Sequence, residues 1–243
     1  MNTRRKLVLF DIDGTLLHCG RIWYESFLGA VQDAFPAQNL PKISFSGKTD
    51  PLIVREMLQG MEISCATDLE SSELARWTHD ILTDYLSRVK AHRDTRVLEE
   101  VRIFPGVLEL INELHSRPDV ILSTLTGNWI EGAKLKLWSA GLHTKIDTEH
   151  GAFGSDHWDR TQLPGVAVQR AYEKSGYHFQ NKDIVILGDT IHDVRCGRAL
   201  NVKSIAVGTG HNADESVLRS ENPDHYFADF SDTQKVIEAV LSD

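Results

Sequence analysis

The chain has 243 residues, of which 41% are hydrophobic, so it is long enough to bury one large core or two modest ones. Aspartate and glutamate total 35 against 26 lysines and arginines, which gives a net charge of −9. This balance argues against binding to nucleic acid or to an anionic membrane surface. We therefore expect a small molecule as the substrate.

Nothing in the sequence indicates export or membrane insertion. No apolar run approaches the roughly 18 residues of a membrane span, and the first residues do not have a signal-peptide pattern. Cys19, Cys65 and Cys196 are scattered, without the spacing of a disulfide framework or of a thiolate zinc site. We expect a cytoplasmic protein.

Short apolar runs that alternate with helical patterns indicate the fold class. Each run is hydrophobic on both faces, as in a buried parallel strand, and each is followed by a pattern with a 3.6-residue period. This rhythm predicts an α/β fold with a Rossmann-like parallel sheet. The expected strands are residues 6–10, 120–125, 183–187 and 202–207.

A long insertion separates the first two strands, and its periodicity is helical throughout. It is too long for a loop, so we expect a second, inserted all-helical domain over residues 17–102. The core would then comprise residues 1–16 and 103–243. Within the insertion, Asp50 and Pro51 are predicted as the N-cap and first residue of a helix. Apolar stripes predict further helices at residues 23–34 and 74–89.

Two carboxylates follow the first strand, in the run Asp11-Ile12-Asp13-Gly14-Thr15. Ligand sites of open α/β sheets lie at the carboxyl ends of the strands, and residues i and i+2 of a strand share one face. Two negative charges in one small site require a cation or a shared proton, and Mg²⁺ is suited to such hard oxygen ligands. Thr15 can donate a hydrogen bond to a phosphoryl oxygen.

A second acidic pair follows the strand that ends near residue 187. Asp189 lies at the strand end, and Asp193 is expected one helical turn further on the same side. Taken alone, Asp193 could equally serve only to complement a helix N-terminus.

Hydrogen-bond donors that could bind an anionic ligand are expected after the strand at residues 120–125. The run Thr126-Gly127-Asn128 places a hydroxyl and backbone amides at the start of a helix. The alternative for Thr126 is a role as a helix N-cap.

The pattern Asp-x-Asp-Gly-Thr after an apolar strand resembles the haloacid dehalogenase superfamily of aspartate-dependent phosphohydrolases. The resemblance implies that Asp11 is the nucleophile and Asp13 the general acid and base. It implies that Asp189 and Asp193 support magnesium, together with the Asp11 side chain and the Asp13 backbone carbonyl. It also favours phosphate binding by Thr126, as in the second motif of the family.

The cationic third motif of the family is ambiguous in this sequence. A Lys-Pro pair is absent, and two candidates remain: Lys136, on the helix that follows Asn128, and Arg160. We prefer Lys136, because its placement resembles a phosphoglycolate-phosphatase-like subgroup and because a compact ammonium can also pair with an aspartate.

The helical insertion follows the nucleophile loop, which is the position of type 1 caps in this family. A cap that closes over the site excludes water and orients the substrate. Within it, Lys48 follows a glycine turn and could contact a substrate carboxylate or sugar. We therefore expect a magnesium-dependent phosphatase acting on a small phosphorylated metabolite. The alternatives are a phosphosugar mutase, a 2-haloacid dehalogenase and an inactive metabolite-binding module.

Overall fold

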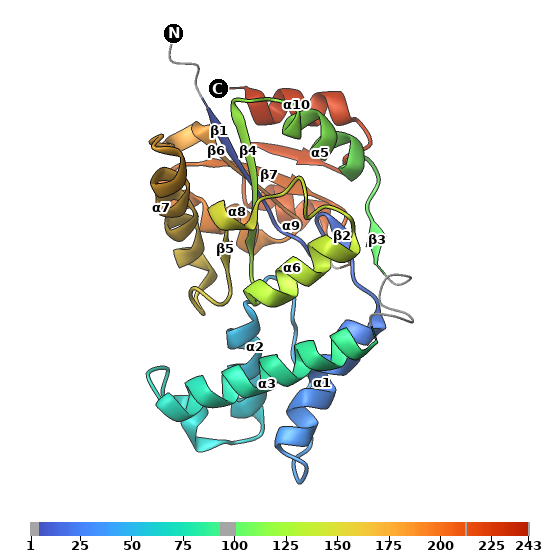
Figure 1. The fold of residues 1–243 in the computed structure, drawn as a ribbon, viewed down its shortest axis with the longest axis vertical. Helices are drawn as coiled ribbons and strands as arrows, with labels where there is room; N and C mark the ends of the chain where they lie inside the picture. The colour runs from blue at the N-terminus through green and yellow to red at the C-terminus, as the bar shows by residue number, and fades with distance from the viewer. Residues whose placement is uncertain (1–4, 93–100, 212, 243) are drawn as a thin grey trace.

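The computed structural model describes residues 5–92, 101–211 and 213–242. Its main feature is a six-stranded parallel sheet in the order β5-β4-β1-β6-β7-β8, which confirms the predicted α/β class (Figure 1). The strands are β1 (Lys6–Phe10), β4 (Val120–Thr126), β5 (Ala152–Phe153), β6 (Ile184–Gly188), β7 (Lys203–Val207) and β8 (His225–Phe227).

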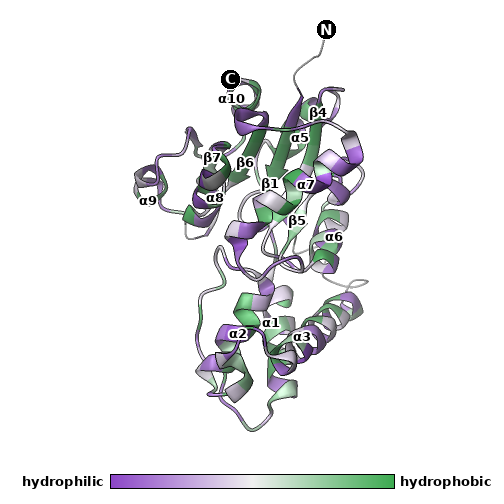
Figure 2. Ribbon diagram, turned by 90° about the vertical axis from the view of Figure 1, so that its left-hand side faces the viewer, coloured by the Kyte–Doolittle hydropathy of each residue, from purple (hydrophilic) through white to green (hydrophobic). Residues whose placement is uncertain are grey.

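The side chains of the central strand β1 are buried on both faces of the sheet. The sequence of this strand is therefore a continuous apolar run. The helices around the sheet are α5 (Val107–His115), α6 (Ile130–Ser139), α7 (Leu163–Ser175), α8 (Ile191–Cys196), α9 (Glu215–Ser220) and α10 (Thr233–Leu241). Val8 and Phe10 pack into one cluster with residues of α5, α6 and α10, whereas Leu7 and Leu9 pack into another with residues of α7 and α8. In Figure 2 the strands β1, β4 and β6 are coloured as hydrophobic, whereas the helices around them carry both hydrophobic and hydrophilic residues.

The four predicted strands are present, with ends that shift by one residue at most. The short edge strands β5 and β8 were not expected, because two or three residues are too few to show a period.

A separate group of helices lies beyond the carboxyl-terminal edge of the sheet (Figure 1). These are α1 (Arg21–Ala34), α2 (Asp50–Gly60) and α3 (Ser72–Ala91), and they enclose a hydrophobic cluster of their own. A two-stranded antiparallel sheet, β2 (Leu17–His18) with β3 (Arg102–Ile103), lies where the chain leaves and re-enters the core.

One prediction for the insertion is corrected. The N-cap of α2 is Thr49 rather than Asp50: the Thr49 hydroxyl accepts a hydrogen bond from the Leu52 backbone N–H, and Asp50 is the first helical residue. Residues 35–49, between α1 and α2, contain no helix. Among the described residues, no helix is both long and apolar enough to cross a membrane.

Candidate active site

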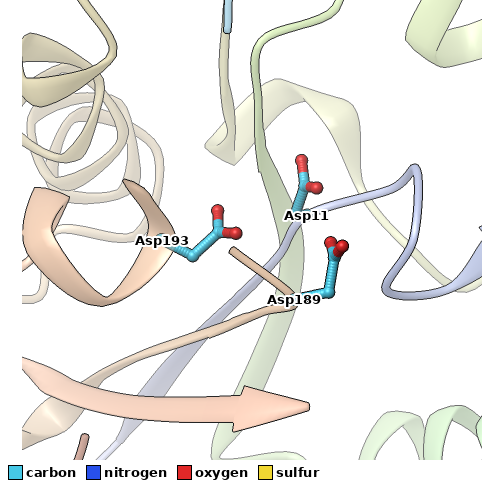
Figure 3. Close-up of side chains that lie close together, drawn as sticks. All are labelled: Asp11, Asp189 and Asp193. Atoms are coloured by element: carbon cyan, nitrogen blue, oxygen red, sulfur yellow. The ribbon is translucent and has the colours of Figure 1, made fainter. Parts of the chain in front are cut away.

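Three buried carboxylates meet at the carboxyl end of the sheet. Asp11 follows β1, Asp189 follows β6, and Asp193 lies in the first turn of α8. Because β1 and β6 are neighbours, the ends of these two strands lie side by side. The three side chains offer oxygen atoms that all lie within 4.8 Å of one another (Figure 3).

This cluster has the electrostatics of a cation site. Burial raises the pKa of Asp11 to about 6 against the opposing charge of Arg160, and the nearby Asp193 and Asp13 charges add to the rise. Burial and the charges of Asp11 and Asp193 raise the pKa of Asp189 to about 8. Crowded carboxylates of this kind are relieved by a divalent ion, and oxygen ligands suit a hard cation such as Mg²⁺. The donor set therefore fits the metal that the sequence suggests.

Glycines make the close approach of these acids possible. Gly14 has a φ of +87°, and a Cβ at this position would overlap the Asp189 carboxylate. A Cβ at Gly188 would overlap the side chain of Asp193. Both positions therefore require glycine for space, and Gly14 requires it also for its backbone conformation.

The Arg160 guanidinium joins two of the three acids. Its Nη2 atom is 3.0 Å from Oδ1 of Asp11 and 2.5 Å from Oδ1 of Asp193. The other oxygen of Asp193 accepts hydrogen bonds from the backbone N–H and the hydroxyl of Thr190, which forms a capping box at the start of α8. Burial lowers the pKa of Arg160, but the charges of Asp193 and Asp11 outweigh it, and the net pKa is raised. Arg160 therefore stays charged.

Lys136 forms an ion pair with Asp13, the second acid after β1. Its Nζ atom donates to Asp13 Oδ2 at 2.6 Å and to Asn128 Oδ1 at 2.6 Å. The Asn128 amide donates in turn to Asp13 Oδ2 at 2.8 Å and to the Thr126 hydroxyl at 2.7 Å. Burial acts to raise the pKa of Asp13, but the charge and hydrogen bond of Lys136 and the hydrogen bond of Asn128 bring it below its usual value.

These groups open on one cavity of about 260 Å³ between the core and the helical cap. Thr15 and Asp193 do not line it: Thr15 is fully buried and donates its hydroxyl to Asp189 Oδ1 at 3.1 Å. Thr126 is not the N-cap of α6, a position that Trp129 occupies. The predicted site residues that line the cavity are Asp11, Asp13, Lys48, Thr126, Gly127, Asn128, Lys136, Arg160 and Asp189.

A family model described as haloacid dehalogenase-like hydrolase matches residues 8–207. The chain belongs to this family. The resemblance drawn from the sequence is confirmed, and so is the enzyme class, a phosphatase-type hydrolase.

The relatives are similar over nearly the whole chain, at low identity. A phosphoglycolate phosphatase of Haemophilus influenzae is 22% identical over 98% of this chain and 100% of its own length. The pyrophosphatase PpaX of Halalkalibacterium halodurans is 21% identical over 95% of each chain.

Two solved structures show the shared fold. A predicted phosphoglycolate phosphatase from Haemophilus somnus has a TM-score of 0.68 at 20% identity, with 98% of this chain and 100% of that one covered. A β-phosphoglucomutase from Clostridium difficile has the same TM-score at 14% identity, with 97% of this chain and 96% of that one covered.

In this haloacid dehalogenase-like hydrolase, the start of α2 docks on the loop that follows β4. The Asp50 carboxylate accepts the backbone N–H of Trp129 at 2.7 Å, and the Asp50 N–H donates to the Gly127 carbonyl at 2.7 Å. The Thr49 hydroxyl donates to the Trp158 carbonyl at 2.6 Å. Asp50 thus belongs to the cavity wall, a position that its local signal, a helix start, does not predict.

Proposed function

We propose that this hydrolase removes the phosphoryl group from small phosphomonoesters, with magnesium, through an aspartyl-phosphate on Asp11. The observation that carries the proposal is that Asp11 and Asp13 line one cavity but have different partners: Arg160 contacts Asp11, and Lys136 contacts Asp13. Two carboxylates in different environments can have two chemical roles.

Asp11 is suited to nucleophilic attack. Its carboxylate oxygen would form a bond to phosphorus as the bond from phosphorus to the leaving oxygen breaks. Arg160 holds this carboxylate in place by the 3.0 Å contact to Oδ1. Thr126, Gly127 and Asn128 at the end of β4 would contact the phosphoryl oxygens.

Asp13 is suited to proton transfer. As an acid it would give its proton to the leaving oxygen, and as a base it would then take a proton from the water that attacks the aspartyl-phosphate. Lys136 favours the ionised form of Asp13. A phosphoryl group that draws Lys136 toward itself weakens that effect, so the pKa of Asp13 rises as substrate binds and the acid form becomes available.

The residues that would hold magnesium are the side chains of Asp11 and Asp189 and the backbone carbonyl of Asp13, with Asp193 in support. When bound, the ion would neutralise phosphoryl oxygens and keep the nucleophile ionised.

Residues 17–102 would form the cap over this reaction. Helices α1 and α2 and the loop between them supply much of the cavity wall, so the cap would exclude water and select the leaving group. We propose that the boundaries between the core and the cap lie at residues 16/17 and 102/103.

The experiment is a hydrolysis screen over phosphoglycolate, sugar phosphates and nucleoside monophosphates, with and without magnesium. We expect magnesium-dependent phosphate release that Asp11→Asn abolishes. Asp80→Asn, at an exposed position on α3, is the matched control and should retain activity. Undiminished turnover by Asp11→Asn would contradict the proposal, and isomerisation of a hexose 1-phosphate with slow hydrolysis would instead indicate a mutase.

A further inference from the structure

Five aromatic side chains of the cap line the active-site cavity, and we call them the aromatic wall. Neighbouring rings within it are in contact, with centroid separations of 5.3 Å for Tyr24 and Phe45, 5.1 Å for Phe27 and Phe45, and 5.5 Å for Phe27 and Tyr85. The set is Trp23, Tyr24, Phe27, Phe45 and Tyr85.

The aromatic wall reaches the catalytic groups. The Trp23 ring packs against Tyr85 at 6.4 Å, and the Lys136 Nζ atom lies 5.0 Å from the centroid of the Trp23 ring. The same Nζ atom is 2.6 Å from Asp13 Oδ2. A leaving oxygen beside Asp13 would therefore direct the rest of its alcohol toward the aromatic wall.

The wall combines buried and accessible rings. Trp23 and Phe27 are 4% and 3% exposed, whereas Tyr24 is 50% exposed. The indole N–H of Trp23 is buried without an acceptor in the described part of the chain.

The cavity offers poor conditions for a substrate carboxylate. Each cation that lines it already has an acidic partner among the described residues: Lys48 pairs with Glu56, Lys136 with Asp13, and Arg160 with Asp11 and Asp193. Four aspartates also line the cavity, and the proposed magnesium would offset the charges of Asp11 and Asp189, so no unpaired cation among the described residues of its wall is left for a further anion. A second anionic group on the substrate, in addition to the phosphate, would therefore be poorly compensated.

We infer that the preferred substrate is a phosphomonoester whose alcohol carries an apolar ring, rather than a carboxylate as in 2-phosphoglycolate. The inference rests on the proposed phosphatase function and narrows it. A cavity of about 260 Å³ lies at the small end of ligand sites, so the ring is accommodated beside the phosphoryl group without a large further substituent. Aromatic faces contact such a ring in stacked or edge-to-face arrangements.

The experiment compares kcat/KM for benzyl phosphate, 2-phosphoglycolate and ethyl phosphate at saturating magnesium. Benzyl phosphate and 2-phosphoglycolate share the CH₂–O–phosphate unit and differ in bearing a phenyl ring or a carboxylate, so the comparison isolates the leaving-group pocket. We expect benzyl phosphate to exceed each of the others by roughly tenfold or more, the range that apolar pockets discriminate. Equal or faster turnover of 2-phosphoglycolate would overturn the inference while the proposed function stands. No turnover of any phosphomonoester, in this set or in the wider screen, would overturn both.

A pair of cap variants tests the role of the aromatic wall. Phe45→Ala removes a half-buried ring of the wall, and Phe35→Ala removes a half-buried ring of the same cap that does not line the cavity. We expect Phe45→Ala to reduce the ratio of benzyl to ethyl phosphate kcat/KM by roughly tenfold. Phe35→Ala should leave that ratio unchanged, because a general loss of cap stability affects both esters alike. An equal fall of the ratio in both variants, or no fall in either of them, would contradict the assignment of Phe45 to the substrate pocket.

Discussion

The guanidinium of Arg160 lies 3.0 Å from the Asp11 carboxylate, while the ammonium of Lys136 lies 2.6 Å from the Asp13 carboxylate. Lys136 and Arg160, the two candidates for the cationic third motif, thus contact different acids. We propose that Arg160 fixes the nucleophile and Lys136 controls the proton-transfer residue.

Removal of the Lys136 charge tests whether Lys136 controls proton transfer by Asp13. Lys136→Ala removes the group that keeps Asp13 ionised, so Asp13 would be protonated when it has to accept the proton of the attacking water. We expect kcat to fall by roughly 10²-fold, within the range for general acid–base catalysis. Lys134→Ala is the matched control, because Lys134 is exposed on the same helix and pairs only with Glu131 among the described residues. Steady-state kinetics that show equal losses for the two variants would contradict the role of Lys136.

Removal of the Arg160 charge tests whether Arg160 holds the Asp11 carboxylate in place. Arg160→Gln leaves the buried Asp11 and Asp193 carboxylates without their cation, so we expect a loss of about 3–5 kcal/mol in the free energy of unfolding when metal is chelated. Magnesium should then stabilise this variant more than it stabilises the wild type. Urea unfolding measures both effects, with Arg198→Gln, at a largely exposed position, as the control. A variant as stable as the wild type in chelator would contradict this electrostatic role.

Metal binding is expected to stabilise the fold. Magnesium that binds only the native state adds about 2.7 kcal/mol at 100 times its dissociation constant. We expect a rise in the melting temperature with magnesium that disappears in Asp189→Asn and persists in Asp80→Asn. Thermal unfolding with and without chelator measures it. An equal rise in Asp189→Asn would exclude Asp189 from the site.

The carboxyl group of Asp50 should make stability depend on pH. Burial, only partly offset by the Lys136 charge and the Trp129 N–H, raises the pKa of Asp50 from 3.8 to about 6. The folded state then holds a proton that the unfolded state releases, so this contribution is fully present below pH 3.8 and is lost as pH rises through 6.

The test compares urea unfolding of the wild type and Asp50→Asn at several pH values between 4 and 7. The neutral amide keeps an acceptor for the Trp129 N–H but carries no charge. We expect the stability of the variant relative to the wild type to increase by on the order of 1–2 kcal/mol across this window. A constant difference would show that burial does not penalise the Asp50 charge.

Much of the fold follows from local patterns. Continuous apolar runs predict the central strands because both of their faces are buried, and the helical period predicts α1 to α3. The edge strands β5 and β8 are too short for such a signal.

The residues of the candidate site could be proposed from the sequence, but their contacts could not. Strand ends identify Asp11, Asp13 and Asp189 because parallel strands bring their carboxyl ends to one edge. The Lys136–Asp13 and Arg160–Asp11 contacts each join side chains that lie more than 100 residues apart in the sequence, so local spacing does not show them. Local spacing likewise does not show that Thr15 donates to Asp189.

The aromatic wall could not be predicted from local sequence patterns either. The period of α1 identifies Trp23 and Phe27 as an apolar stripe, but it cannot distinguish a ring that packs in the cap core from one that also lines a cavity. Phe45 lies outside any helix and carries no periodic signal.

Chemical trapping can detect the proposed covalent intermediate on Asp11. The enzyme is quenched in acid during turnover and treated with borohydride, which reduces an acyl phosphate to an alcohol, and its peptides are analysed by mass spectrometry. We expect the Asp11 side chain to be reduced in the enzyme quenched with substrate and to be unmodified without it. Full turnover with no reduced residue, or with the reduction at another carboxylate, would contradict the proposed mechanism.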